Sequence, residues 1–231
     1  MAGPGQVHLL LYTFDPAYVL RTLPELWAGL RLTLAISAIG IAGSLVVGLA
    51  GGALCAARVP IVGSTVGLYV ELFRNTPLIV QLFFLYFGLP ELHVTLSAFT
   101  AGWLGLVLWG GAYNVENFRA GFGAVNRGYQ EAARALGMGA LATFLSVVLP
   151  IGLRISIPSL TNTCISVLKN SSYLIAISLP ELTTTAINIV SLSFRVFEMF
   201  GAIAIVYLAL VWALSGMMAV VERRLALPEG A

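Results

Sequence analysis

The sequence predicts an all-α integral membrane protein with five transmembrane helices, its N-terminus outside and its C-terminus inside. Of the 231 residues, 59% are hydrophobic and only 10% are charged, whereas soluble domains are about 25% charged. Because so few charges cannot cover a water-soluble globule of this size, lipid must solvate much of the surface. Soluble enzymes are thereby excluded. Nucleic-acid binding is excluded too, because the net charge is only +2 and the sequence has no basic block.

Stretches without charged residues locate the expected membrane crossings. Residues 32–57, 92–115 and 199–221 contain no Asp, Glu, Lys or Arg. Each stretch exceeds the roughly 20 apolar residues that a helix needs to cross a bilayer. Two further apolar stretches, Leu68–Leu89 and Ile155–Leu179, are interrupted by charged residues. We expect these two to cross as well, which makes five spans.

The first span is unusually rich in small residues, which are Gly40, Gly43, Gly48, Gly51 and Gly52. Gly48 and Gly52 have the spacing of a GxxxG motif. Small residues let helix backbones approach closely in lipid. We therefore expect this span to pack tightly against another helix.

The distribution of arginine sets the expected orientation. With the N-terminus outside, two basic residues lie outside, Arg21 and Arg195, and seven lie inside. The seven are Arg58, Arg119, Arg127, Arg134, Arg154, Arg223 and Arg224. An excess of basic residues on the inner side is typical of membrane proteins. Residues 1–24 are then an external N-terminal leader, residues 25–224 the transmembrane domain, and residues 225–231 a cytoplasmic tail.

The longest inner loop, about residues 116–154, contains a predicted short helix with an alanine face. The stretch that follows Gln130 consists mainly of Glu, Ala, Arg and Leu, which are good helix formers. Glu131 is expected near the helix start, where the helix dipole favours an anion. Gly137 or Gly139 can end the helix.

Five motifs of this sequence resemble those of ABC importer permeases and follow one another along the chain in the family's order. In the inner loop, Glu131-Ala132-Ala133, then Gly137 and then Val147-x-Leu149-Pro150 resemble the EAA loop of that family, with Val147 where Ile is usual. Four other stretches match the branch that transports polar amino acids. They are Trp27–Leu34, Glu71–Gln81 with Asn75 where Gly is usual, Ala112–Tyr113 with Glu116 and Arg119, and Lys169–Ser172 with Asn170 where Asp is usual.

The resemblance covers residues 25–224 and implies the transmembrane domain of a type I ABC importer with a cytoplasmic coupling helix. It implies a multi-pass subunit of an ATP-driven amino acid importer in the bacterial cytoplasmic (inner) membrane. Two ATPase subunits, a second permease that is identical or paralogous, and an external substrate-binding protein are the implied partners, with no nucleic acid. The residues expected to couple this chain to the ATPases are Gln130, Glu131, Ala132, Ala133, Leu136, Gly137 and Met138.

The chain is not expected to be an enzyme. A P-loop needs Gly-x4-Gly-Lys-Ser/Thr, but the only lysine, Lys169, follows Ser166-Val167-Leu168 without a glycine loop. ATP and Mg would therefore be bound by the partner ATPase, with no cofactor, metal site or catalytic residue in this chain. Three other classes stay open, namely an ATP-independent channel or secondary transporter, an intramembrane enzyme and a non-transporting scaffold.

Polar residues inside the spans have two possible roles, because charges in a bilayer core are costly and should face the bundle or a wet cavity. Some would line the translocation pathway and others would hold helices together as ion pairs. The candidates for the pathway are Gln81, Tyr113, Asn114, Asn162, Lys169, Asn170, Ser171 and Ser172. The candidates for structural ion pairs are Glu71, Arg74, Glu116 and Arg119. Glu181 and Glu198 do not decide the charge of the substrate.

Overall fold

The computed structural model describes residues 13–56 and 60–225, and every regular element in these ranges is a helix. This confirms the predicted all-α class. The α-helices are α1 (Pro16–Ala56), α2 (Pro60–Asn75), α3 (Leu78–Phe83), α4 (Ala98–Gly123), α5 (Arg127–Ala135), α6 (Ala140–Thr143), α7 (Leu149–Asn170), α8 (Leu182–Ser193) and α9 (Val196–Leu225). π-helical turns at Phe84–Gly88 and Phe144–Val148 and 3-10 turns at Leu89–Leu92 and Ser171–Ile177 extend α3, α6 and α7.

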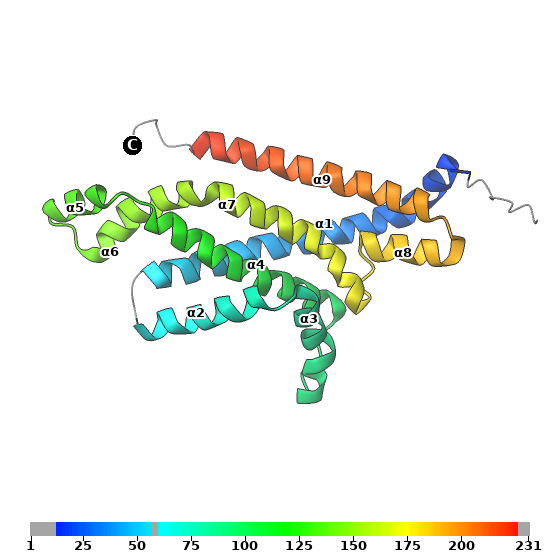
Figure 1. Ribbon diagram of the computed structural model, residues 1–231, viewed down its shortest axis with the longest axis horizontal. Helices are drawn as coiled ribbons and strands as arrows, with labels where there is room; N and C mark the ends of the chain where they lie inside the picture. Colours follow the sequence, from blue (N-terminus) through cyan, green and yellow to red (C-terminus); the bar gives the residue numbers. More distant parts are fainter. Residues whose placement is uncertain (1–12, 57–59, 226–231) are drawn as a thin grey trace, which may run out of the picture.

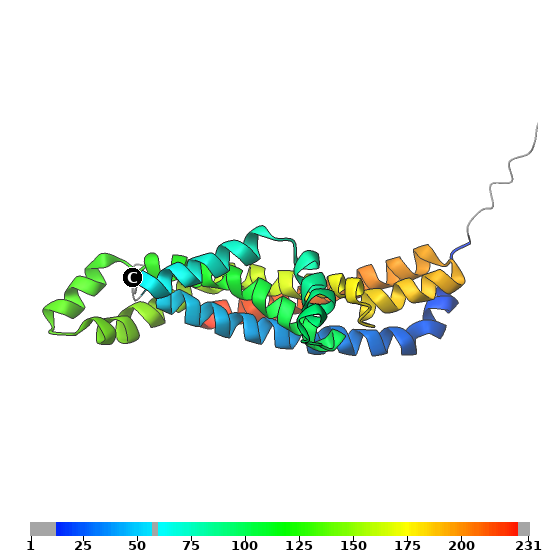
Figure 2. The same ribbon diagram turned by 90° about the horizontal axis from the view of Figure 1, so that it is seen from below.

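The long helices run side by side along an elongated bundle (Figures 1 and 2). At one end lie α5 and α6, and the C-terminal ends of α1 and α9 point towards it. We call this the α5 end. At the other end lie α8 and the first turns of α1 and α9, and we call this the α8 end. One apolar core cluster joins α1, α8 and α9 near the α8 end, and another joins α1, α4 and α7 near the α5 end.

Within the described residues, three helices are long and apolar enough to cross a membrane, namely α1, the continuous helix Ala140–Ile177, and α9. The expected second span, Leu68–Leu89, is not one straight helix. The segments Val62–Asn75 and Leu78–Leu92 meet at 105° and count as a fourth span only if they are taken together. The break falls at Pro77, which has an extended backbone before α3 and lacks the N–H that would continue α2.

The remaining expected spans differ in detail from the structure. α4 has the length of a span, with 26 residues, but it is less apolar because Gly, Trp, Tyr and Asn interrupt its aliphatic residues. α1 begins at Pro16, so part of the expected leader, residues 16–24, belongs to this helix. The expected inner loop is shorter than residues 116–154, since α4 continues to Gly123 and α7 starts at Leu149.

The most extensive helix contact is between α1 and α4. Glycines of α1 face α4 so closely that a Cβ at Gly48 would lie 2.3 Å from the Cβ of Asn114, and a Cβ at Gly52 would lie 2.7 Å from the Cβ of Phe118. Real side chains do not approach to such distances. The expected role of the small residues in the first span is therefore confirmed, because only glycine allows this contact.

The substitution Gly48→Ala tests the contact. The added methyl has to displace the α4 backbone, and overpacking of this kind costs about 1–3 kcal/mol. We expect a lower Tm for the purified protein in detergent. Gly216→Ala in α9 is the matched control, because nothing lies within 4 Å of a Cβ there and alanine favours a helix. Equal Tm values for the two variants would contradict a close α1–α4 contact.

Candidate functional site

The short helix predicted in the inner loop is present as α5. It begins at Arg127, where the side chain of Asn126 accepts a hydrogen bond from the N–H of Gly128 at 2.9 Å. Its first turn contains no acidic residue. The expectation that Glu131 lies near the helix start is therefore wrong, because the Asn126 cap starts the helix four residues before Glu131.

The exit from α5 depends on Gly137, one of the two glycines expected to end the helix. This residue has φ of +79°, in the left-handed region. Its N–H donates to the carbonyl of Arg134 at 2.9 Å, and the N–H of Met138 donates to the carbonyl of Ala133 at 3.1 Å. This pair of bonds is the Schellman motif that ends many helices. No atom lies within 4 Å of a Cβ at Gly137. Glycine is therefore favoured here by the backbone conformation and not by a lack of space for a side chain.

The two alanines of the loop motif face different surroundings. Ala133 is 4% exposed, and α5 packs against α6 and the π-helical turn Phe144–Val148. Ala132 is exposed, so only this alanine is available to a partner. The loop also exposes apolar side chains, with Leu136 at 83% and Leu141 at 70%.

The remaining residues of the expected coupling set follow the same division. Glu131 is exposed, and Gln130 and Met138 are half-buried. α5 thus presents an outer face to solvent while an inner face holds it against the rest of the chain.

Three of the four predicted ion-pair residues meet between α2 and α4. Arg119 hydrogen-bonds both carboxylate oxygens of Glu116, and Arg74 Nη1 lies 3.9 Å from Glu116 Oε2. The Arg74 guanidinium also stacks over the ring of Tyr113, 5.0 Å from its centroid. The fourth residue, Glu71, is exposed on α2 and forms no ion pair among the described residues. Its predicted ion pair is thus not formed within the described residues, because the basic group next to it, Arg74, turns to Glu116.

Gln81 holds the bend between α2 and α3. It is 8% exposed, and its Nε2 donates to the carbonyls of Phe73 at 2.9 Å and of Thr76 at 3.1 Å. These carbonyls lie at the end of α2, where helical partners run out. The prediction that Gln81 lines a pathway is therefore corrected to a cap within the fold.

Asn114 joins three helices and is fully buried. Its Nδ2 donates to Ser44 Oγ on α1 at 3.2 Å, and its Oδ1 accepts from Asn117 Nδ2 at 3.1 Å. Asn117 in turn donates to Thr163 Oγ1 on α7 at 2.9 Å. Asn114 is thus used in helix packing, and its predicted pathway role has no support from an open position. Asn117 was missed by the sequence reasoning, although its spacing of three residues from Asn114 places both on one face of a helix.

An exposed polar face runs along α7. It consists of Asn162, Ser166 and Lys169, whose spacing puts them on one side of the helix, and we call it the α7 polar face. Asn162 and Lys169 are exposed, and Ser166 Oγ donates to the carbonyl of Asn162 at 2.9 Å. Lys169 forms no ion pair with any described residue. The structure thus gathers two of the predicted pathway residues on one accessible surface.

The other predicted pathway residues are used within the fold. Ser171 is fully buried and donates to the carbonyl of Leu168 at 2.7 Å. Ser172 Oγ donates to the carbonyl of Lys169 at 2.8 Å, and Asn170 is the half-buried last residue of α7. Tyr113 is half-buried against Trp109, with ring centroids 4.5 Å apart. Ser171 and Tyr113 thus pack within the fold, and the structure gives their predicted pathway role no support from an open position.

Glu181 is buried and connects α8 to its neighbours. It is 0% exposed and caps α8, accepting from the backbone N–H groups of Thr183 at 3.0 Å and Thr184 at 2.8 Å. Its carboxylate also accepts from the hydroxyl of Tyr207 on α9 at 3.1 Å. A carboxylate is a favoured cap of a helix N-terminus. The position of Glu181 between Pro180 and a run of threonines is the sequence signal for this cap.

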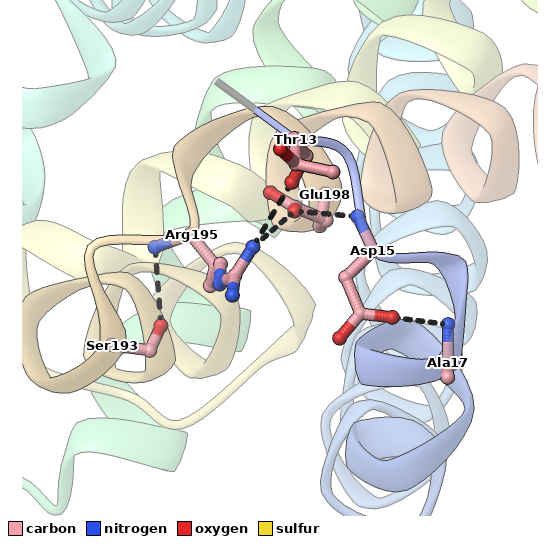
Figure 3. A network of polar contacts seen from close by, with 6 residues as sticks. All are labelled: Thr13, Asp15, Ala17, Ser193, Arg195 and Glu198. Carbon is pink, nitrogen blue, oxygen red and sulfur yellow. Dashed lines mark hydrogen bonds and ion pairs between the residues drawn. The ribbon is translucent and has the colours of Figure 1, made fainter. Parts of the chain in front are cut away.

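Glu198 ties the start of α9 to the start of α1 (Figure 3). It is 0% exposed, and its Oε1 accepts from Arg195 Nη1 at 3.1 Å and from the backbone N–H of Asp15 at 3.0 Å. Arg195 also donates to the carbonyl of Thr13 at 3.2 Å. Both buried glutamates thus join helices at the α8 end, which agrees with leaving them out of any inference on substrate charge.

Comparison with known proteins gives a consistent result over most of the chain. Residues 48–227 match the family described as "Binding-protein-dependent transport system inner membrane component". The glutamine transport system permease protein GlnP of Escherichia coli (strain K12) is 34% identical over 92% of this chain and 98% of its own. The probable amino-acid permease protein YxeN of Bacillus subtilis (strain 168) is 31% identical over 94% of this chain and 98% of its own.

Solved structures show the same arrangement of helices. A chain of an amino acid ABC transporter, crystallised with histidines, has a TM-score of 0.85 at 32% identity, over 92% of this chain and 100% of that chain. A chain of the MetNI methionine ABC transporter in an inward-facing conformation has a TM-score of 0.77 at 19% identity, over 90% and 99% of the two chains. The second likeness concerns the fold alone.

Proposed function

The chain belongs to the family of binding-protein-dependent transport system inner membrane components, and from this premise we propose that it is the membrane-spanning subunit of an ATP-driven amino acid importer. The observation that carries this proposal is the near full-length likeness to amino acid permeases, one of 34% identity in sequence and one with a TM-score of 0.85 in structure. The exposed helix α5 supplies a physical means of coupling such a subunit to an ATPase.

In this proposal the chain crosses the bacterial cytoplasmic (inner) membrane five times. The crossings are α1, the bent pair of α2 and α3, α4, the helix Ala140–Ile177, and α9. The α5 end faces the cytoplasm and the α8 end faces outside. The basic residues of the described elements near the α5 end support this orientation, and they are Arg119, Arg127, Arg134, Arg154, Arg223 and Arg224. Residues 1–24 are then the outer segment and residues 225–231 the inner tail.

The assembly contains a second permease, identical or paralogous, two ATPase subunits and an external substrate-binding protein. ATP and Mg bind to the ATPase subunits, since this sequence has no P-loop. The outer face of α5, with Ala132 and the exposed Leu136, docks on an ATPase. Ala132 lets the partner surface approach closely, and Leu136 offers apolar area to bury.

Movement of α5 reaches the membrane through α7. The buried side of α5 packs against the π-helical turn Phe144–Val148, which continues directly into α7. Because the turn and α7 form one continuous helix, a displacement of α5 by a closing ATPase shifts α7 along with it. α7 carries the polar face with Asn162 and Lys169, so the shift exposes this face alternately to the two sides of the membrane.

The α7 polar face lines the translocation pathway. Its ammonium group, on Lys169, suits the carboxylate of an amino acid, and the Asn162 amide offers both a donor and an acceptor. Lys169 is free of ion pairs with other described residues, so an approaching carboxylate would not compete with an internal partner.

Co-expression with the partners tests the proposed function. Vesicles that contain this chain with its ATPase are expected to take up an amino acid only with ATP inside and the binding protein outside. The measurement is uptake of radiolabelled amino acid, with a hydrolysis-deficient ATPase as control. Uptake without any ATPase would instead establish the alternative, an ATP-independent channel or secondary transporter, which no observation on this chain favours.

A pair of substitutions at Gly137 tests the coupling role of α5. Gly137→Val is expected to lower both ATPase stimulation and uptake, because a β-branched residue at φ of +79° forces a different exit from α5. Gly137→Asn is the matched control, since asparagine tolerates the left-handed region, and it should retain most activity. Full activity of Gly137→Val, at equal abundance in the membrane, would contradict the coupling role.

Substitutions on and off the α7 polar face separate pathway from packing. Lys169→Ala and Asn162→Ala are expected to change the apparent affinity and specificity of uptake per folded molecule, with Tm unchanged because both residues are exposed. Asn114→Ala should lower Tm by removing the buried hydrogen bonds that Asn114 makes with Ser44 and Asn117, while specificity per folded molecule stays the same. If Lys169→Ala and Asn162→Ala only reduce abundance, the α7 polar face is not the pathway.

A further inference from the structure

An apolar groove lies between α1, α4, α7 and α9 on the half of the bundle towards the α5 end. Its volume is about 510 Å³, which is within the roughly 300–1,000 Å³ of ordinary ligand pockets. Its lining residues include Leu45, Phe118, Leu153, Ile157 and Leu225, and the single charged residue among those that line it is Arg154. An apolar slot with one cation at its edge suits an amphiphile with an anionic head.

The groove exists because α9 packs firmly only at its start. The buried residues of α9 are Glu198, Met199 and Ile203, all in its first turns. The C-terminal two-thirds of the helix therefore lies along the bundle without inserting side chains deeply into it (Figure 1). Material other than the described part of this chain has to fill the space between α9 and its neighbours.

The length of the groove along α7 matches the thickness of one leaflet of a bilayer. Its α7 wall runs from Pro150 to Leu160, which is about 15 Å at 1.5 Å per residue and half of a hydrocarbon core of about 30 Å. Side chains on a helix lean towards its N-terminus, so Arg154 leans towards the α5 end. At that end Arg223 and Arg224 occupy the last turn of α9, beside the groove residue Leu225.

Arg154 is available to a ligand. It is exposed, and its guanidinium makes no hydrogen bond or ion pair with any residue in the described ranges. The acidic residue nearest to the groove along α9, Glu222, is not paired with it in the structure. The planar fork of an unpaired guanidinium matches the oxygens of a phosphate or a carboxylate.

The apolar wall of the groove lies on the opposite side of α7 from the α7 polar face. At about 100° per residue, the groove residue Leu153 points about 180° away from Asn162, whereas Arg154 lies at the edge of the groove, about 80° from Asn162 around the helix. The amino acid proposed to pass along the polar face is therefore not the occupant of the groove. We propose that an anionic phospholipid of the inner leaflet binds here, with an acyl chain between α7 and α9 and its phosphate on Arg154. The assignment to the inner leaflet rests on the proposed orientation, whereas the binding site does not.

Lipid retention by the full-length protein tests the site. The chain, assembled with its ATPase partners, is reconstituted in vesicles of equal parts phosphatidylglycerol and phosphatidylcholine and then re-extracted in a mild detergent. Both lipids retained per protein are counted by mass spectrometry. We expect the unmodified protein to be enriched in phosphatidylglycerol, and Arg154→Gln to lower this enrichment about fivefold, the effect of one arginine on an anionic lipid.

Two further variants make the result specific. Arg31→Gln removes an exposed arginine of α1 that does not line the groove, and it should leave the enrichment unchanged. Leu153→Trp fills the slot and should reduce retention of both lipids. Tm is measured for each variant so that only folded protein is compared, and Arg154→Gln alters an exposed side chain, which keeps the test open if Leu153→Trp does not fold.

Three results would overturn the proposal. Equal retention of the two lipids by the unmodified protein would show that the groove does not select an anionic head. The same enrichment in Arg154→Gln and Arg31→Gln would show that Arg154 does not hold the phosphate. Retention by the unmodified complex no greater than that by Leu153→Trp would show that another protein surface, such as the second permease, covers the groove.

Discussion

The close approach of α1 to α4 is the contact on which the rest of the structure depends. Because Gly48 carries no side chain, the backbone of α4 at Asn114 lies directly against α1. That proximity lets Asn114 reach Ser44 on one side and Asn117 on the other, and Asn117 then binds α7 through Thr163. In lipid, where apolar burial gives little drive for helix association, such packing and interhelical hydrogen bonds hold helices together. α7 is thus positioned by a chain of contacts that begins at a glycine.

α7 packs against α1 and α4, and the two sides of α7 that remain open have different chemistry. One side is the polar face with Asn162 and Lys169, and the other is the wall of the apolar groove with Leu153. The same helix is continuous at its N-terminal end with the turn against which α5 packs. In the proposed mechanism, a movement of α5 therefore acts on the polar face and on the groove side of α7 together. A bound anionic lipid would stabilise particular positions of α7 relative to α9, which links the proposed site to the transport cycle.

Features of the site that depend on residues close together in the sequence were more predictable than features that depend on residues far apart in the sequence. An end of α5 at Gly137 or Gly139 was predictable, because a helix often stops at a left-handed residue directly after it, which is a local requirement; the structure selects Gly137. The placement of Glu131 was wrong because Asn126, an equally local signal, begins the helix earlier. Gln81 and Asn114 resembled pathway residues because polar groups in apolar spans suggest wet surroundings. Their true partners, at the end of α2 and on α1, are visible only in the folded chain.

The sequence by itself determined that lipid surrounds much of this protein, and it determined the all-helical class, the family and the position of the α5 helix. These features follow from composition, charge spacing and local motifs, which need no knowledge of the fold. Only the tertiary structure decided that the second expected span bends by 105° at Pro77, which polar residues face inwards, and that a groove opens beside Arg154. Each of these depends on how helices distant in sequence pack together. Helical periodicity shows which residues share a face, but the packing of neighbouring helices decides whether that face is buried or open.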